Sequence, residues 1–268
     1  MAASIPLLTR SQGAHIRELQ IDRRVRAQEG AFVVEGAHAV RDLLTRFPAQ
    51  CVTIVSAHSY LSKEGQKDRL VRLKSSTQQF SCSDLQFSRL SDLDTPQGIL
   101  AVVRQPTWDE DEVLRRPALL GIFGEHIQDP ANVGAIIRTA AALNVSGLWL
   151  TPESGDVFQP KVVRATSGVL LALPIFVSKD LSGLIQQGCR IFAAEVTGGM
   201  AVSIDEIREA PRKLVLAFGN ESRGLSTSVL EQATTRFTIP LSRAVESLNV
   251  AATVAIATFY YSRLPKRN

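Results

Sequence analysis

The feature that most constrains the fold is a regular alternation of short apolar segments with helical segments from Ala118 onward. Strands that are apolar on both faces and separated by helices form mostly parallel sheets with helices on each side. We therefore expect an α/β unit here. Its expected strands are Leu119–Phe123, Gly147–Leu150, Leu173–Val177, Arg190–Ala194, Leu214–Phe218 and Arg236–Ile239. Its expected helices are Val133–Leu143, Lys161–Thr166, Leu181–Gln187, Ser203–Arg208, Ser226–Ala233 and Leu248–Ser262.

A smaller α/β unit precedes this one, because apolar runs and amphipathic segments alternate there as well. The expected strands are Ala31–Gly36, Cys51–Ser56, Phe80–Ser83 and Gly98–Arg104. The expected helices are Arg10–Asp22, Ala37–Phe47, Lys63–Ser75 and Ser88–Leu93.

A polar stretch between Pro106 and Pro117 separates the two units, and its residues from Asp109 to Glu112 are all acidic. Flanking prolines and polar composition are typical of a linker, although the acidic start also suits a short helix. We predict three parts: residues 1–106 as a small domain, residues 107–117 as a linker and residues 118–268 as the larger domain.

Composition is that of a globular protein without a membrane span. Hydrophobic residues make up 45% of the chain and charged residues 21%. The apolar runs fall short of the roughly 20 residues that a membrane helix needs, and the N-terminus lacks a secretory signal. Cys51, Cys82 and Cys189 lack the spacing of a metal site. We expect buried, reduced thiols, no metal and a cytoplasmic location.

The excess of positive charge lies entirely in the N-terminal part. Residues 1–106 hold 14 Lys and Arg against 10 Asp and Glu, whereas residues 107–268 hold 16 of each kind. A partner rich in phosphate would meet the N-terminal part first, with Arg17–Arg26 as a basic face. An ordinary solvated surface explains the same charge equally well.

The first polar constellation, EHIQDPANVGAIIRTA, follows the first strand of the larger unit and opens a helix. Asp129 or Asn132 can accept the free amide hydrogens at the helix start, and Pro130 suits the first turn. Arg138 is the only charged residue in Val133–Leu143. A guanidinium among such neighbours must find an anion or several acceptors, or else extend its charged end into water.

The second constellation is Gly219–Gly224, GNESRG, directly after a buried strand. Its backbone amides, the Glu221 carboxylate and the Arg223 guanidinium suit a polar ligand. The loop lacks the Lys-Ser/Thr ending of a phosphate-binding P-loop, and no strand is followed by GxGxxG. A dinucleotide-dependent oxidoreductase is therefore disfavoured. An ordinary turn explains this loop, taken alone, about as well.

The third constellation follows the last strand and opens the last helix. Ser247 is a candidate N-cap. Asn249 would then lie inside the first turn, where asparagine is unfavourable for helix stability. Asn249 is the stronger functional candidate of the two for that reason.

Taken together, DPANVGAIIRTA, LVLAFGNESRGL and FTIPLSRAVESLNVAATVAI resemble, in order and spacing, the three motifs of the SpoU/TrmH family. These are the RNA ribose 2′-O-methyltransferases of the SPOUT superfamily. KVVRATSG looks like another segment of that family, and RRVRAQEGAFVVEG and TPQGILAVV are similar to its small substrate-binding domain. The resemblance implies a SPOUT-type parallel sheet with a C-terminal trefoil knot, S-adenosylmethionine bound in the knotted loops, and a homodimer that binds RNA.

The resemblance also implies roles for single residues. Arg138 matches the catalytic arginine, which is held to help deprotonate the ribose hydroxyl. Because a guanidinium stays protonated, stabilising the developing alkoxide is the alternative that needs no proton loss. Asn132, Glu221, Ser247 and Asn249 match polar residues that position substrate, arginine and cofactor. The cofactor-binding positions match Leu216, Ala217, Gly219, Ile239, Leu241, Ser247 and Leu248.

Departures from the family pattern are small. Arg243 and Ala244 stand where relatives often have glycine, as does Asn144 after the first helix. We expect methyl transfer from S-adenosylmethionine to a ribose 2′-hydroxyl of large-subunit (23S) ribosomal RNA. The alternatives are 2′-O-methylation of transfer RNA, methylation of a base, and a non-catalytic RNA-binding factor in ribosome assembly.

Overall fold

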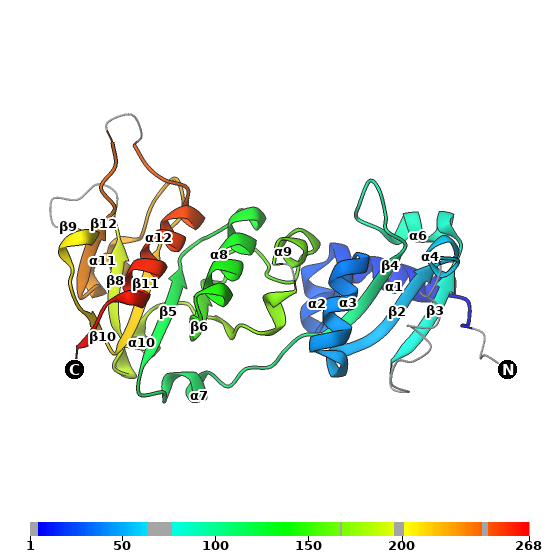
Figure 1. Ribbon diagram of the computed structural model, residues 1–268, viewed down its shortest axis with the longest axis horizontal. Helices are drawn as coiled ribbons and strands as arrows, with labels where there is room; N and C mark the ends of the chain where they lie inside the picture. The colour runs from blue at the N-terminus through cyan, green and yellow to red at the C-terminus, as the bar shows by residue number, and fades with distance from the viewer. Residues whose placement is uncertain (1–4, 64–76, 167, 196–200, 243–245, 268) are drawn as a thin grey trace. The chain divides into compact units, whose positions relative to one another are not determined.

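The structure is a computed structural model that describes residues 5–63, 77–166, 168–195, 201–242 and 246–267 (Figure 1). The chain folds into two compact units. The first comprises Met1–Pro106 with Asp156–Leu171, and the second comprises Thr107–Gly155 with Ala172–Asn268.

The second unit is built on a seven-stranded sheet in which every pairing among the described residues is parallel (Figure 1). The strand order is β7-β6-β5-β11-β8-β12-β9. The strands are β5 (Leu119–Gly124), β6 (Gly147–Leu150), β7 (Ile175–Val177), β8 (Arg190–Ala194), β9 (Val202–Ser203), β11 (Lys213–Phe218) and β12 (Thr235–Thr238). The predicted parallel sheet is confirmed, and all strands except β9 lie where the sequence places them.

Helices cover both faces of this sheet. They are α7 (Glu110–Leu114), α8 (Pro130–Ala142), α10 (Ser182–Gln186), α11 (Thr227–Gln232) and α12 (Val250–Arg263). On one face, Phe123 and Trp149 pack with Leu184 of α10 and Val229 of α11 in a buried cluster. On the other, Tyr261 of α12 packs edge-on against Phe192 and Phe237, with ring centroids 5.5 and 5.3 Å apart. Alternate strand residues thus point into two separate helix layers.

The residues expected to form a linker pack into the second unit instead. Val113 and Leu114 of α7 belong to the same buried cluster. Trp149 Nε1 donates a hydrogen bond to the Glu110 carboxylate at 2.7 Å, and Lys213 Nζ donates to the Leu114 carbonyl at 2.7 Å. Asp109 caps α7 through the Glu112 amide, so the acidic run starts a short helix. The buried pair Val113–Leu114 explains why the stretch is ordered.

The helix expected at Ser203–Arg208 does not form. Ser203 ends β9, and only Ile204–Glu206 make a 3₁₀ turn, η3. The Ser203 hydroxyl bonds the Asp205 carboxylate rather than a backbone amide. A side chain engaged in this way leaves the first turn of a helix without its cap.

Asn144 follows α8 in the left-handed conformation, with φ at 55°. Glycine adopts this conformation without strain, and asparagine tolerates it better than most other residues. Asparagine at this position, where the family resemblance leads us to expect glycine, is therefore compatible with the helix end. Arg243 and Ala244 lie outside the described residues.

The first unit is built on a four-stranded sheet with the order β1-β4-β2-β3, in which only β2 and β3 are parallel. The strands are β1 (Ala31–Glu35), β2 (Cys51–Ala57), β3 (Gln78–Cys82) and β4 (Ile99–Arg104). The helices and turns are α1 (Arg10–Ile21), α2 (Arg23–Glu29), α3 (Ala37–Arg46), η1 (Pro48–Gln50), α4 (His58–Leu61), α6 (Asp84–Leu90), α9 (Pro160–Ala165) and η2 (Val169–Leu171).

Two helices of this unit differ from the predicted ones or fall outside the described residues. The helix expected at Ser88–Leu93 begins earlier, because the Ser83 hydroxyl accepts a hydrogen bond from the Gln86 amide at 3.1 Å and caps α6. The helix expected at Lys63–Ser75 lies outside the described residues, apart from Lys63 itself.

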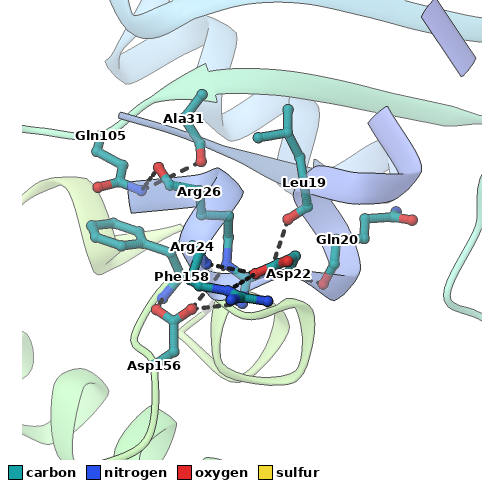
Figure 2. A network of polar contacts seen from close by, with 9 residues as sticks. All are labelled: Leu19, Gln20, Asp22, Arg24, Arg26, Ala31, Gln105, Asp156 and Phe158. Atoms are coloured by element: carbon teal, nitrogen blue, oxygen red, sulfur yellow. Dashed lines mark hydrogen bonds and ion pairs between the residues drawn. The ribbon is translucent and has the colours of Figure 1, made fainter. Parts of the chain in front are cut away.

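Arg26 lies at the centre of a buried polar network in the first unit (Figure 2). Its guanidinium is bonded to one Asp156 carboxylate oxygen through Nε at 2.9 Å and Nη2 at 2.6 Å. Its Nη1 donates to the carbonyls of Leu19 and Gln20 at 2.7 and 2.8 Å. Arg26 is therefore not part of a solvent-facing basic surface, which corrects the expectation for this one residue of Arg17–Arg26, whereas Arg23 and Arg24 are exposed.

Residues 156–171 are held in the first unit by this ion pair and by apolar packing. The centroids of the Phe158 and Phe32 rings are 5.0 Å apart, and α9 packs against β1. Arg164 of α9 is also paired with Asp92 at 3.1 Å. The sequence-based division counts these residues within 118–268, because a segment between two strands of one sheet gives no local sign of packing elsewhere.

Candidate functional site

The candidate site is formed by loops at the carboxyl ends of three neighbouring strands, β8, β11 and β12. The start of α8 belongs to it as well, since α8 follows β5 and β5 is the other neighbour of β11. Ligands of parallel α/β sheets bind at this end of the strands. The three sequence constellations meet here.

Asn132, Glu221 and Asn249 form a hydrogen-bonded cluster, with one residue from each constellation. The Asn132 side-chain amide donates to the Glu221 carboxylate, and its carbonyl oxygen accepts from the Asn249 amide at 2.8 Å. Asn132 is 7% exposed. An amide engaged at both ends fixes the directions of the Glu221 carboxylate and of the Asn249 side chain. The structure thus joins three of the predicted site residues.

Asn249, and not Ser247, is the N-cap of α12. Its side-chain oxygen accepts from the amides of Ala251 at 2.8 Å and Ala252 at 3.4 Å. Capping therefore explains asparagine at this position, which corrects the prediction that it lies inside the first turn. The remaining half of the side chain, the amide nitrogen, points to Asn132. One residue thus ties the helix start to the cluster.

The loop after β11 is held by Asn220 at its base. The Asn220 amide donates to the His126 carbonyl at 3.0 Å, and its oxygen accepts from the amides of Ser222 and Arg223 at 2.9 and 3.3 Å. The Gly224 amide closes the turn onto the Asn220 carbonyl at 2.8 Å. Such an Asx-type turn leaves the neighbouring Glu221 side chain free to reach Asn132.

Gly219 lies where no side chain fits. A Cβ at this position would be 2.1 Å from the Gly224 carbonyl carbon and 2.3 Å from the Leu225 nitrogen. Both are backbone atoms of the same closed turn, so they cannot move aside without opening it. Glycine is needed here for close backbone approach.

Two adjoining cavities lie among these loops, with volumes of about 470 and 180 Å³. The larger is lined by Gly219 and polar residues of the loop after β11, together with Ser247 and Leu248 from the segment before α12. The smaller is more apolar and is lined by Ile239, Leu241 and again Leu248. The larger cavity is in the size range of small-molecule sites, and the smaller one extends it.

Leu216 and Ala217 line neither cavity. Both are fully buried in β11, and Ala217 belongs to the buried cluster that contains Leu184 of α10 and Val229 of α11. They support the loop from within the sheet. The other residues predicted to hold the cofactor, Gly219, Ile239, Leu241, Ser247 and Leu248, all line one or both cavities.

Arg138 is exposed on α8 and does not join the cluster. It lies six residues after Asn132, and at 100° per residue this places the two side chains on different sides of the helix. Among the described residues it makes no hydrogen bond or ion pair. Its guanidinium is thus free to meet an anion that is not part of this chain.

The sequence alone did not predict roles for two carboxylates near the site, Glu125 and Glu195. Glu125 holds the start of α11, because its oxygens accept from the Ser226 amide and hydroxyl, both at 2.7 Å. Glu195 follows β8, and its side chain lines both cavities. A polar residue directly after a strand of the predicted sheet was the available signal, and it was as strong for Glu195 as for Glu221.

Potential metal ligands and free thiols are two other kinds of reactive group in the described part of the chain. No cluster of His, Cys, Asp and Glu there could hold a metal ion. Burial raises the pKa of the Cys51 thiol to about 12 and of the Cys82 thiol to about 11, and it also raises the pKa of Cys189. Because the thiolate is the reactive form, these three are poor nucleophiles. No described helix is long and apolar enough to cross a membrane.

Comparisons with known proteins agree with this geometry. Residues 120–259 match the SpoU rRNA Methylase family, and residues 14–101 match the MRM3-like substrate binding domain. An uncharacterised tRNA/rRNA methyltransferase from Synechocystis is 30% identical, with 97% of this chain and 94% of the relative aligned. The 23S rRNA (guanosine(2553)-2′-O)-methyltransferase of Bacillus subtilis is 26% identical over 89% of this chain and 91% of its own length.

Among solved structures, the AdoMet-bound rRNA methyltransferase from Sinorhizobium meliloti is similar with a TM-score of 0.81. It is 25% identical, and the match covers 97% of this chain and 96% of the other. The family match spans more than half of the chain and contains all three constellations. From its sequence, its sheet and the cluster that joins the three motifs, the chain belongs to the SpoU rRNA methylase family.

Proposed function

We propose that this protein transfers a methyl group from S-adenosylmethionine to a ribose 2′-hydroxyl of ribosomal RNA, with 23S rRNA as the expected substrate. The observation that carries the proposal is the Asn132–Glu221–Asn249 cluster beside a cavity built from three strand-end loops. Relatives over nearly the full chain are named as rRNA 2′-O-methyltransferases, and a structural neighbour carries AdoMet.

The residues that line the cavities fit such a cofactor. Gly219 permits close backbone approach, and the apolar walls Ile239, Leu241 and Leu248 suit a planar base. The Glu221 carboxylate and Ser247 supply polar groups in the larger cavity. When bound, the cofactor supplies an electrophilic methyl group, so the protein has mainly to align it with the ribose oxygen.

Within this site some residues position other side chains, and one stabilises charge on the substrate. Asn132 fixes the side chains of Glu221 and Asn249, and Glu221 in turn lines the larger cavity. Arg138 stabilises the negative charge that develops on the ribose oxygen, with its proton retained. Because Arg138 does not meet the cluster within one chain, the substrate or a second subunit brings it into the site.

We also propose a homodimer, a trefoil knot formed by the loops after β11 and β12, and a cytoplasmic protein whose first unit binds the RNA while its second unit carries out methyl transfer. Exposed Ile256 and Phe259 of α12 support the dimer, since they leave an apolar strip on a helix that packs against α8. Light scattering of the purified protein measures its mass, and a value for one chain at micromolar concentration would count against the dimer.

Methyl transfer is tested directly with labelled S-adenosylmethionine and unmodified ribosomal or transfer RNA, followed by nucleoside analysis. A 2′-O-methylnucleoside from ribosomal RNA is the expected product. If only transfer RNA yields this nucleoside, then the substrate is transfer RNA and not ribosomal RNA. If the product is a methylated base, then the reaction is base methylation and not ribose methylation. If neither RNA is modified although the protein binds both RNA and the cofactor, the non-catalytic assembly role is favoured.

Gly219→Ala should weaken cofactor binding by about tenfold or more, because the new methyl group forces the closed turn of the β11 loop to open. Isothermal titration with S-adenosylhomocysteine measures the change. Gly183→Ala is the matched control, since a Cβ there meets no atom within 4 Å and alanine favours the helix in which it lies. Equal affinities for the two variants would show that the loop is not part of the cofactor site.

A further inference from the structure

Glu195 carries a buried carboxylate oxygen that lacks a hydrogen-bond partner among the described residues, and it lines both cavities of the site. Its carboxylate is 14% exposed and follows β8 directly. The Oε2 atom is buried and makes no hydrogen bond among the described residues. Buried polar atoms are nearly always hydrogen-bonded, so an unpartnered one beside a cavity indicates a missing donor.

Arg236 does not supply that donor. Its Nη1 lies 3.8 Å from Glu195 Oε2, which is an ion-pair contact too long for a hydrogen bond. The Nε and Nη2 atoms of Arg236 donate instead to the Leu230 carbonyl at 3.2 and 3.1 Å. The guanidinium therefore offsets part of the cost of burying the carboxylate charge while leaving its lone pairs open.

The position of Glu195 between the two cavities indicates which part of the cofactor it meets. The smaller cavity, with Phe237, Ile239 and Pro240, offers apolar surface for adenine. The larger contains Glu221, which belongs to the cluster where the methyl group has to be presented. In S-adenosylmethionine the ribose connects adenine to the sulfur, so it has to lie between the two. Glu195 lines both cavities.

We propose that the Glu195 carboxylate accepts hydrogen bonds from the ribose hydroxyls of S-adenosylmethionine and thereby selects ribonucleoside cofactors. A carboxylate takes only acceptor roles when ionised, and two vicinal hydroxyls provide the donors that Oε2 lacks. Dinucleotide-binding sheets use an acidic residue for ribose hydroxyls in the same way, on an unrelated site. This assignment rests on the proposed methyltransferase function and adds a residue outside the three motifs.

Isothermal titration of the full-length protein tests it. Glu195→Gln keeps the shape of the side chain but weakens its acceptor strength and introduces an NH₂ donor. It should raise the Kd of S-adenosylhomocysteine about 10- to 100-fold. Analogues that lack the ribose 2′- or 3′-hydroxyl should bind the wild type more weakly than the parent does. At least one analogue should lose little further affinity in Glu195→Gln, because the hydrogen bond is already absent.

Glu231→Gln, an exposed carboxylate on α11, is the matched control and should bind like the wild type. If Glu195→Gln weakens binding of the parent compound and of both deoxy analogues by the same factor, the ribose assignment is overturned, since the effect of the substitution would then be indirect. A loss for S-adenosylmethionine without one for S-adenosylhomocysteine would overturn it too, and would assign the carboxylate to the sulfonium. If the wild type binds neither S-adenosylmethionine nor S-adenosylhomocysteine, both the proposed methyltransferase function and the ribose assignment fail.

Discussion

Arg138→Ala should lower the single-turnover rate of methyl transfer by about 10²- to 10³-fold while leaving the Kd of S-adenosylhomocysteine nearly unchanged. Loss of one preorganised group that stabilises a developing oxyanion has this magnitude in other enzymes. Arg138 is exposed and lines neither cavity, so its removal disturbs neither the loops nor the cluster. Rapid quench with saturating cofactor measures the rate.

Two further variants make the Arg138 result specific. Arg138→Lys keeps the charge but loses the planar set of donors, so it should recover only part of the rate. Arg115→Ala removes an exposed guanidinium of the same unit whose only ion-pair contact within the described residues is Asp109 at 3.7 Å, and it should react like the wild type. Loss of cofactor binding in Arg138→Ala would instead mean that the residue shapes the cofactor site.

Arg26→Ala should destabilise the first unit by about 3–5 kcal/mol, because it leaves the Asp156 carboxylate buried without its cation. The side chains are 5% and 14% exposed, so solvent screens the pair little. The substitution also removes the donors to the Leu19 and Gln20 carbonyls. The midpoint of urea unfolding, followed by circular dichroism, measures the loss for the full chain.

Arg24→Ala is the control for this network. The Arg24 side chain is 94% exposed, and its contact with Asp22 is 3.6 Å long. Its replacement should leave the urea midpoint where it is in the wild type. The double variant Arg26→Ala with Asp156→Ala should be less destabilised than the sum of the two single variants. An Arg26→Ala protein that unfolds at the wild-type midpoint would show that the network does not hold residues 156–171.

Local pattern predicted much of the architecture. Runs such as Leu214–Phe218 are apolar on both faces and end in polar loops, and this is enough to predict a parallel sheet with its ligand at the strand ends. The pattern failed where a local signal had competing explanations. A helix was expected to begin at Ser203, but the Ser203 hydroxyl binds Asp205 and only a 3₁₀ turn follows. Ser247 looked like a helix cap, but Asn249 two residues later makes the capping bonds.

By itself, the sequence determined the parallel α/β sheet, the polar constellations after its strands and the residues with which the chain resembles its family. Only the tertiary structure decided which of those side chains meet. Asn132 and Asn249 are 117 positions apart in the chain, and they touch because α12, which Asn249 caps, packs against α8, which contains Asn132. It also decided that Arg26 is buried and that Glu195 Oε2 has no hydrogen-bond partner in the described part of the chain. The physical reason is that periodicity reports which face of an element is buried, whereas strand order and long-range contacts arise from packing between elements that no local window contains.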